Sequence, residues 1–453
     1  MTAFSVVDEV RVGPEGRVYT EGWQSWSPAT WYSPGGDGLR PDHGWQHTMR
    51  FRPGTPLADA GLQAEGLLVV DPGTGEQVRW YVAPTPTDVP TLRTTLRYDV
   101  VEVSADGPVR MGTAASAGAA LAAAVAGLTT SVTVRQAPAV WCSWYRYFEQ
   151  VTAADVVENL DAFARYELPV EVVQVDDGWS LGLGEDLAPS PGFGDLAALV
   201  GRVRDADRRA GLWLAPFLVG TSTTFARTHP DWLVGEAGHN WGQDLRGLDL
   251  THPGVQDLLR EHLGRLVGLG VDYLKLDFLY GGAVPGARHS GASPVEAYRT
   301  GLELVREAVG PAVHLVGCGA PLLPSVGLVD AMRTSPDTFH EGGEDGSRGL
   351  RGLMPMVARS WQHGRLWSCD PDCLVARPSY ALREPWAEAV RTYGGLRSSS
   401  DRVAELDEWG LRATRDLLGD AVPPVPLADG TVDRGARLAA TLVGGQRDAA
   451  VEA

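Results

Sequence analysis

The stretch VDYLKLD, at residues 271–277, decides the fold. It has the length and apolar content of a buried strand, and it ends in an acidic residue. Further runs of strand length are AVWCSW (139–144), VEVVQVDD (170–177), LWLAPF (212–217), VHLVGCG (313–319), DAMRTS (330–335), RLWSCD (365–370) and LRSSSD (396–401), and three of these seven also end in an acidic residue. Amphipathic segments typical of helices lie between and after these runs, at residues 153–166, 195–210, 255–269, 295–309 and 403–418. Thr152 and Ser293 stand where N-caps belong.

Strands that alternate with helices over about 280 residues predict a parallel sheet and an α/β fold. About eight repeats favour a (β/α)8 TIM barrel, which we expect over residues 139–419, above an open doubly wound sheet. No G-x-G-x-x-G motif follows the first strand, which argues against a dinucleotide-binding fold.

Segments of other composition flank the predicted barrel. Residues 1–112 are rich in Gly and Pro and contain β-prone runs such as GLLVV, QVRWYV and TLRYDVVEVS, which predict an antiparallel β-sandwich. Residues 113–138 are expected to be a linking helix and a connector. Residues 420–453 leave room only for a short C-terminal segment, which we expect to be a β remnant.

Composition narrows the class of protein. The 453 residues are 44% hydrophobic and 21% charged, which is typical of a globular chain. The formal net charge of −18 disfavours nucleic acids and anionic membranes as partners. Fifteen tryptophans are compatible with carbohydrate binding, although core packing explains them as well.

The sequence offers no sign of export or of a metal centre. The N-terminal stretch lacks a secretory signal, and no apolar run is long enough to span a bilayer, so we expect a cytoplasmic protein. Four cysteines are too few for a disulfide scaffold and are expected to be reduced: Cys142, Cys318, Cys369 and Cys373. The motif SCDPDC (368–373) is a weak zinc pattern without a second pair, and we expect no metal.

The carboxyl ends of barrel strands form the active site of a TIM barrel, and several predicted strands end in acidic residues. Clustered carboxylates without a histidine cluster favour glycosidic chemistry, in which one carboxylate attacks and another protonates the leaving oxygen. Lys275 and Asp277 share one face of their strand, and the ammonium group is expected to lower the pKa of Asp277, as a nucleophile needs. A buried structural ion pair is the alternative.

Two further acidic motifs fit the same chemistry. Asp337, in DAMRTSPDT, follows the same strand as Arg333 and is a candidate proton donor, which needs a raised pKa; the alternative is a loop residue that caps a turn. Asp176 and Asp177, in QVDDGWS, can together accept hydrogen bonds from neighbouring sugar hydroxyls. A metal site is the alternative for this pair.

Long motifs in the same order resemble the bacterial α-galactosidases of glycoside hydrolase family 36, from about Gly22 to Leu418. They are WQSW (23–26), WCSWYRYF (141–148), QVDDGW (174–179), LWLAPF (212–217), YLKLDFLYGGAVPG (273–286), GCGAPLLPSVGLVDAMRTSPDT (317–338) and LWSCDPDCL (366–374). The resemblance implies that Asp277 is the nucleophile and Asp337 the acid/base. It also implies substrate-binding roles for Trp26, Trp144, Asp176, Asp177, Trp213, Lys275, Cys318 and Arg333.

By this resemblance we expect a retaining hydrolase without a cofactor, acting on terminal α-linked galactose of oligosaccharides, and a homo-oligomer. The chain departs from the family in its shorter ends and in Leu276, where many members have Trp. Galactosyl transfer, action on N-acetylgalactosamine and an inactive sugar-binding homologue remain alternatives. A Schiff-base lyase using Lys275 is disfavoured, because Asp277 beside it should raise the pKa of the lysine.

Overall fold

The barrel dominates the structure, a computed structural model that describes residues 3–41, 44–182, 187–339, 343–428 and 430–438. Its eight strands are parallel and lie in the order β19-β18-β17-β16-β12-β11-β10-β20. The strands are β10 (Ala139–Cys142), β11 (Val172–Val175), β12 (Arg209–Leu214), β16 (Val271–Leu276), β17 (His314–Gly317), β18 (Ala331–Arg333), β19 (Ser368–Asp370) and β20 (Arg397–Ser399). Each of the eight predicted strands is present, and the TIM barrel is confirmed.

Backbone hydrogen bonds close the barrel where its last strand returns to the first edge. The amides of Gly395 and Leu396, just before β20, both donate to the carbonyl of Cys369 at 2.8 Å. Farther along, the amide of Leu374 donates to the carbonyl of Ser398 at 2.8 Å. The sheet therefore has little unpaired edge between β19 and β20.

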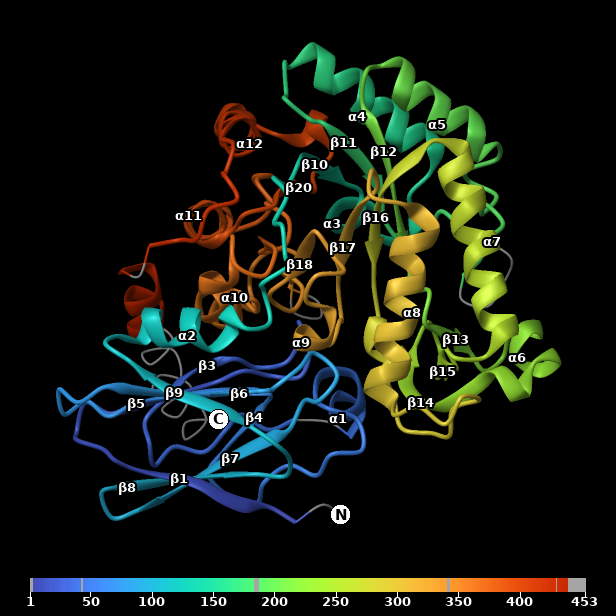
Figure 1. Ribbon diagram of the computed structural model, residues 1–453. Coiled ribbons are helices and arrows are strands. Elements are labelled where there is room, and N and C mark those ends of the chain that lie inside the picture. Colours follow the sequence, from blue (N-terminus) through green and yellow to red (C-terminus); the bar gives the residue numbers. More distant parts are fainter. Residues whose placement is uncertain (1–2, 42–43, 183–186, 340–342, 429, 439–453) are drawn as a thin grey trace.

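Helices surround the strands, as Figure 1 shows. They include α4 (Ala153–Arg165), α5 (Leu196–Asp205), α7 (Pro253–Leu269), α8 (Pro294–Val309), α11 (Arg383–Tyr393) and α12 (Glu408–Gly419). Thr152 and Ser293 cap α4 and α8, as predicted. Each also forms a capping box with the acidic residue three positions on. No helix in the described part of the chain combines the length and the apolar character needed to cross a membrane.

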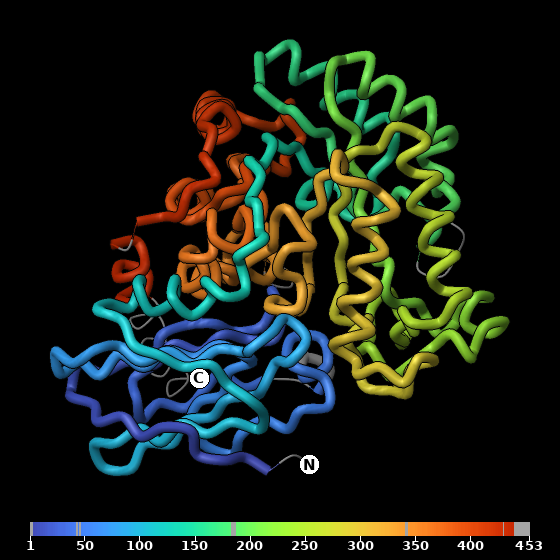
Figure 2. Tube along the Cα trace, in the orientation of Figure 1, coloured from blue at the N-terminus to red at the C-terminus, as the bar shows by residue number. Residues whose placement is uncertain are grey.

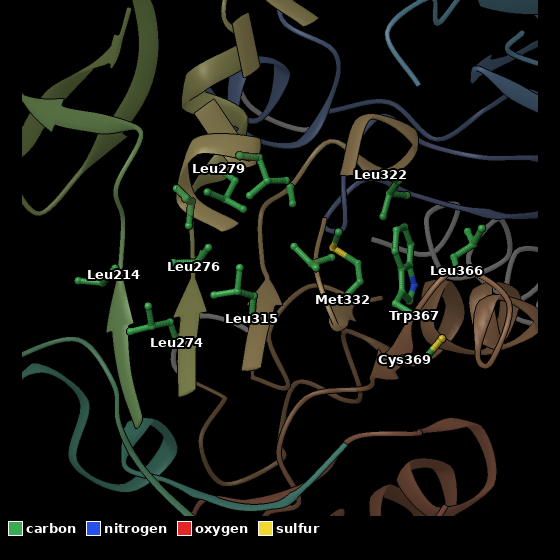
Figure 3. Packing of buried hydrophobic residues seen from close by; sticks show 14 of the residues in the cluster. Leu214, Leu274, Leu276, Leu279, Leu315, Leu322, Met332, Leu366, Trp367 and Cys369 are labelled. Carbon is green, nitrogen blue, oxygen red and sulfur yellow. The ribbon is translucent and has the colours of Figure 1, made fainter. Parts of the chain in front are cut away.

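Side chains along β16 alternate between the outer and the inner face of the barrel. Leu274 and Leu276 pack with Leu214 and Leu315 in the large cluster that includes apolar residues of α7 and α8 (Figure 3). Tyr273 instead joins a smaller cluster of residues from β10, β11, β17 and β18 inside the barrel. Because successive side chains of a strand point to opposite faces, Lys275 lies on the inner side with Tyr273.

The N-terminal part is a β-sandwich of two antiparallel sheets, which confirms that expectation. One sheet has the order β1-β8-β7-β4 and the other β3-β2-β5-β6-β9. The strands are β1 (Ser5–Arg11), β2 (Arg17–Thr20), β3 (Thr30–Tyr32), β4 (Leu62–Glu65), β5 (Leu67–Asp71), β6 (Val78–Val82), β7 (Thr91–Arg97), β8 (Val100–Ala105) and β9 (Arg110–Ala114). Helix α2 (Ala117–Ala126) packs on β5, β6 and β9, and Figure 2 traces the chain from it into β10.

An insertion between β12 and β16, which the sequence did not predict, builds a small antiparallel sheet above the barrel. It consists of β13 (Leu218–Gly220), β14 (Leu233–Asn240) and β15 (Gln243–Leu248) in the order β13-β15-β14. Helix α1 (Gly44–Arg50), which belongs to the sandwich, packs against β14. This contact brings the sandwich to the rim of the barrel.

The predicted C-terminal β remnant is wrong for the described residues. Residues 430–438 are helical, and residues 439–453 lie outside the described part of the chain. The buried Val432 and Ala436 are four positions apart, which is the spacing of one helical face and does not suit a strand. Arg17 in the sandwich pairs with Asp433 at 3.1 Å and ties this segment to the N-terminal domain.

Candidate active site

A cavity of about 270 Å³ opens at the carboxyl ends of the barrel strands. Eight of the ten site residues expected from the sequence line it: Trp26, Trp144, Asp176, Asp177, Trp213, Lys275, Asp277 and Asp337. Cys318 and Arg333 lie behind this lining, where the Arg333 guanidinium approaches the Cys318 sulfur at 3.8 Å. The barrel and the sandwich, which supplies Trp26, thus bring residues from positions 26 to 337 into one cavity.

Asp277 lies directly after β16 and is buried. Its Oδ2 accepts a 3.0 Å hydrogen bond from the indole of Trp213, and its Oδ1 accepts one of 2.8 Å from the amide of Phe278. Phe278 adopts a left-handed φ of 50°, so the chain turns sharply away from the strand just after Asp277. The carboxylate is therefore held in one orientation at the floor of the cavity.

Lys275 contacts a different carboxylate from the one expected. Its Nζ lies 2.9 Å from Oδ2 of Asp176, and the pair is buried. Burial raises the pKa of Asp277, and Lys275 and Trp213 oppose this rise without reversing it. Lys275 does lower the pKa of Asp277 by its charge, as expected. The expectation of a lowered pKa overall is wrong, because the rise caused by desolvation is larger than this effect.

The pKa of Lys275 itself behaves as the sequence suggested. Burial would lower it, but Asp176 and Asp277 raise it well above the usual range. Asp176 also accepts a 2.6 Å hydrogen bond from Gln174, and its amide donates to Ser143 at 2.9 Å. This saturated arrangement keeps the lysine charged at the bottom of the site.

Asp177 also lines the cavity, and its carboxylate has partners of its own. Its Oδ2 accepts a 2.7 Å hydrogen bond from the indole of Trp241, and its Oδ1 accepts one of 2.8 Å from the amide of Gly178. Burial raises the pKa of Asp177 to about 6, and the charge of Asp176 adds to the rise while Trp241 opposes it.

Asp337 follows β18 and is held by Arg333, whose Nη2 donates to Oδ1 at 2.8 Å. The Asp337 side chain is 45% exposed, whereas that of Arg333 is buried. The same Nη2 lies 2.6 Å from Oδ2 of Asp372, a buried residue with a left-handed φ of 81°. Tyr145 and the amide and hydroxyl of Thr338 also donate to Asp372, so it anchors Arg333 from below.

Aromatic rings form the walls. Trp26, from the sandwich, packs edge-on against Phe278 with ring centres 5.0 Å apart. The ring centres of Trp213 and Trp241 are 6.2 Å apart, and Trp144, which also lines the cavity, packs against Phe148. Such faces suit the apolar side of a sugar ring.

Sequence reasoning missed part of the lining: Met49, Arg50, Glu149, Asn240, Trp241, Phe278, Pro336 and Arg351. Trp241 is the most informative of these because it binds Asp177 directly. It lies in the turn between β14 and β15 with a left-handed φ of 49°. The only sequence signal was HNWG (239–242), a turn-like tetrapeptide in a segment without assigned strands.

The sulfur atoms of the site are thiols in this structure. All four cysteines are free and buried, and burial raises the pKa of Cys318 well above its usual range. Within the described ranges, no group of three or more His, Cys, Asp or Glu side chains has an arrangement that could hold a metal ion.

Comparisons with known proteins agree with this geometry. The melibiase family model matches residues 129–298. The chain is similar to the α-galactosidase of Thermus thermophilus, solved with p-nitrophenyl α-D-galactopyranoside: 27% identity, a TM-score of 0.75, and coverage of 93% of this chain and 90% of that one. The same protein in complex with stachyose gives 26% identity and a TM-score of 0.77 over 92% and 93% of the two chains.

Two curated relatives match over shorter regions. The bifunctional α-galactosidase/sucrose kinase AgaSK of Mediterraneibacter gnavus is 27% identical over 154 residues, 31% of this chain and 16% of its own length. An Escherichia coli α-galactosidase is 28% identical over 172 residues, 34% of this chain and 23% of its own. The matched part thus spans less than a quarter of either relative. The barrel, the sandwich and the partial match of the family model thus all make the chain similar to the α-galactosidases of the melibiase family, glycoside hydrolase family 36.

Proposed function

We propose that the protein is a retaining α-galactosidase that hydrolyses terminal α-linked galactose from oligosaccharides, with Asp277 as nucleophile and Asp337 as general acid/base. The observation that carries the proposal is that these two carboxylates, from the ends of different strands, line the same cavity. One is buried and oriented by Trp213, and the other is 45% exposed. This division suits a residue that attacks the sugar and one that meets the leaving group and water.

In the first step, an oxygen of ionised Asp277 attacks the anomeric carbon while the bond to the leaving oxygen breaks. Protonated Asp337 gives its proton to that oxygen, and a galactosyl ester of Asp277 remains. In the second step, Asp337 takes a proton from water, the water oxygen attacks the anomeric carbon, and the ester bond breaks. Two inversions release galactose with its original α configuration.

The remaining site residues would hold the sugar. Asp176 and Asp177 are hydrogen-bond acceptors for its hydroxyl groups, and Lys275 and Arg333 are donors. Trp26, Trp144 and Trp213 offer ring faces, and Cys318 supports the Asp277 side of the pocket. The complexes of the Thermus thermophilus relative with an aryl α-galactoside and with stachyose support galactosides as the substrate class.

The test is a panel of aryl α-glycosides with the wild type and Asp277→Ala and Asp337→Ala variants. We expect hydrolysis of the galactoside, a loss of at least about a thousandfold in Asp277→Ala, and recovery of Asp337→Ala activity by azide. Asp272→Asn is a matched control, because Asp272 lies at the other end of β16 and pairs with Arg209.

Stereochemistry tests the mechanism separately. Proton NMR of the first product should detect α-galactose before mutarotation, whereas β-galactose as first product would refute double displacement. Normal turnover by Asp277→Ala would refute the nucleophile. Faster hydrolysis of an N-acetylgalactosaminide, or transfer to an added sugar that outpaces hydrolysis, would reassign the activity within the same chemistry.

A further inference from the structure

A buried arginine joins the sandwich to the barrel just behind the active-site cavity. Arg359 is the last residue of α10 (Leu353–Arg359) and has no solvent exposure. Its Nε donates to Oε1 of Glu21 at 2.8 Å, and Glu21 is also buried. A charge in such a place is stable only when it is paired and hydrogen-bonded.

The hydrogen bonds of Arg359 are complete. Besides Glu21, its guanidinium donates to the backbone carbonyls of Gln24 (3.3 Å), Ser25 (2.8 Å), Ser27 (3.0 Å) and Thr334 (3.0 Å). The five N–H groups of an arginine therefore meet five acceptors. Lysine, with three donors at one point, cannot reproduce this planar set.

The four backbone acceptors belong to two loops that reach the cavity. The loop of residues 24–27 carries Trp26, and Thr334 lies three residues before Asp337. One nitrogen, Nη1, donates to both loops, because it contacts the carbonyls of Ser25 and Thr334. The guanidinium thus fixes the distance between the sandwich's contribution to the pocket and the loop of the acid/base residue.

The same loop holds a third part of the lining. The Gln24 amide donates to the carbonyl of Met49, and the Ser27 hydroxyl donates to the carbonyl of Arg50. Met49 and Arg50 end helix α1 and line the cavity. The loop also wraps tightly, since a Cβ at Gly22 would lie 2.3 Å from Cβ of Ser27 and 3.2 Å from Nη2 of Arg359.

We propose that Arg359, with Glu21, is a positioning residue that sets Trp26 and Asp337 relative to each other across the domain boundary. This inference rests on the proposed function for its kinetic consequences. It concerns residues that do not line the cavity, and it makes the sandwich part of the catalytic unit.

Arg359→Lys tests this, with Arg306→Lys as matched control. Arg306 likewise joins a carboxylate, Asp330 at 2.7 Å, to backbone carbonyls such as that of Val313 at 2.9 Å, but at the opposite end of the strands. The two substrates are 2,4-dinitrophenyl α-galactoside, whose leaving group needs no proton, and melibiose, whose leaving group does. Ser25 stays bonded to Ala320 in either variant, which favours folding of Arg359→Lys.

If Arg359 positions Asp337, the variant should lose about tenfold or more in kcat/KM on melibiose beyond its loss on the dinitrophenyl substrate. KM should rise for both substrates because Trp26 also shifts. Arg306→Lys should lower Tm and leave the ratio of the two kcat/KM values, melibiose to dinitrophenyl galactoside, unchanged. Glu21→Gln should shift the ratio in the same direction by a smaller factor.

An equal loss on both substrates with KM unchanged would mean a purely structural role and would overturn the inference. Hydrogen exchange gives a reading that needs no turnover: peptides covering residues 22–27 and 333–338 should both exchange faster in Arg359→Lys than in Arg306→Lys. Unchanged exchange in either peptide would also overturn it. A wild type that hydrolyses neither galactoside would refute the proposed function, and exchange would still decide the role of Arg359.

Discussion

The indole of Trp241 donates a 2.7 Å hydrogen bond to the carboxylate of Asp177, and so links the insertion between β12 and β16 to the end of β11. Burial raises the pKa of Asp177 to about 6, and the Trp241 hydrogen bond works against this rise. A hydrogen bond to the ionised form of a carboxylate stabilises that form. The insertion therefore acts on the charge state of the site as well as on its shape.

Trp241→Phe should raise the pKa of Asp177 above about 6, because the donor is lost while burial remains. If ionised Asp177 binds the sugar, the acid limb of kcat/KM should move to higher pH by up to about one unit, and KM at pH 6 should rise several-fold. The check is a pH profile from 4.5 to 8 with an aryl α-galactoside.

Trp232→Phe is the matched control for this profile. Trp232 belongs to the same insertion and stacks on His229 at 4.1 Å, away from the cavity lining. Its variant should keep the wild-type acid limb. An unshifted limb in Trp241→Phe would show that Asp177 does not control binding through its charge.

Asp177→Asn should weaken sugar binding and raise stability at neutral pH. A carboxyl whose folded pKa, about 6, lies above its usual value of 3.8 binds its proton more tightly in the folded state. Stability is therefore lost as pH rises from about 4 to about 6, by up to about 3 kcal/mol if nothing else changes. The variant does not titrate, so its Tm relative to wild type should improve between pH 4 and pH 7, while activity falls. A Tm difference independent of pH would contradict the raised pKa.

The barrel could be predicted from the sequence because its strands are short apolar runs, and several of them stop at an acidic residue. Apolar runs of strand length stop at Asp176, Asp277 and Asp370, and alternation along VDYLKLD separates the helix-facing leucines from the inner Lys275. The insertion at residues 218–248 could not be found in this way. Its two longer strands, β14 and β15, are only partly buried and lack the continuous apolar pattern of the barrel, and β13 has only three residues.

The sequence also could not predict which side chains on different strands contact each other. Spacing puts Lys275 and Asp277 on one face of β16, and that much is local geometry. Which carboxylate the ammonium reaches depends on β11, two strands away in the sheet, where Asp176 accepts it. Desolvation of Asp277 is also a property of the assembled pocket, and it outweighs the neighbouring charge that the sequence reveals.

Lys275→Met should damage both stability and pH response. Asp176 and Asp277 would remain buried without their cation, and losing one member of a buried ion pair costs on the order of 3–5 kcal/mol. The pKa of Asp277 should rise further, because the ammonium opposes the effect of burial. Since uncompensated carboxylates cost most when ionised, the loss should be larger at pH 7 than at pH 5, as measured by denaturant unfolding.

Adding Asp176→Asn to Lys275→Met separates the two roles of the lysine. The double variant no longer buries an unpaired charge at position 176, so part of the lost stability should return. Activity should stay low, because Asp277 still lacks its cation and the sugar still lacks two ligands. Recovery of activity along with stability would show that Lys275 serves only the fold.

Two helix glycines should respond to alanine in opposite directions. Gly264, on the exposed side of α7, has open space where a Cβ would stand, with nothing within 4 Å, so Gly264→Ala should stabilise by about 0.5–1 kcal/mol through helix propensity and reduced unfolded-state entropy. Gly301, in the neighbouring α8, is buried, and its Cβ would lie 2.4 Å from Cδ1 and 2.9 Å from Cβ of Leu250. Gly301→Ala should therefore destabilise, by about 1–3 kcal/mol. Thermal unfolding of both variants is the measurement. A gain in Gly301→Ala would contradict this packing of α8 on Leu250, and a loss in Gly264→Ala would contradict the open space beside Gly264.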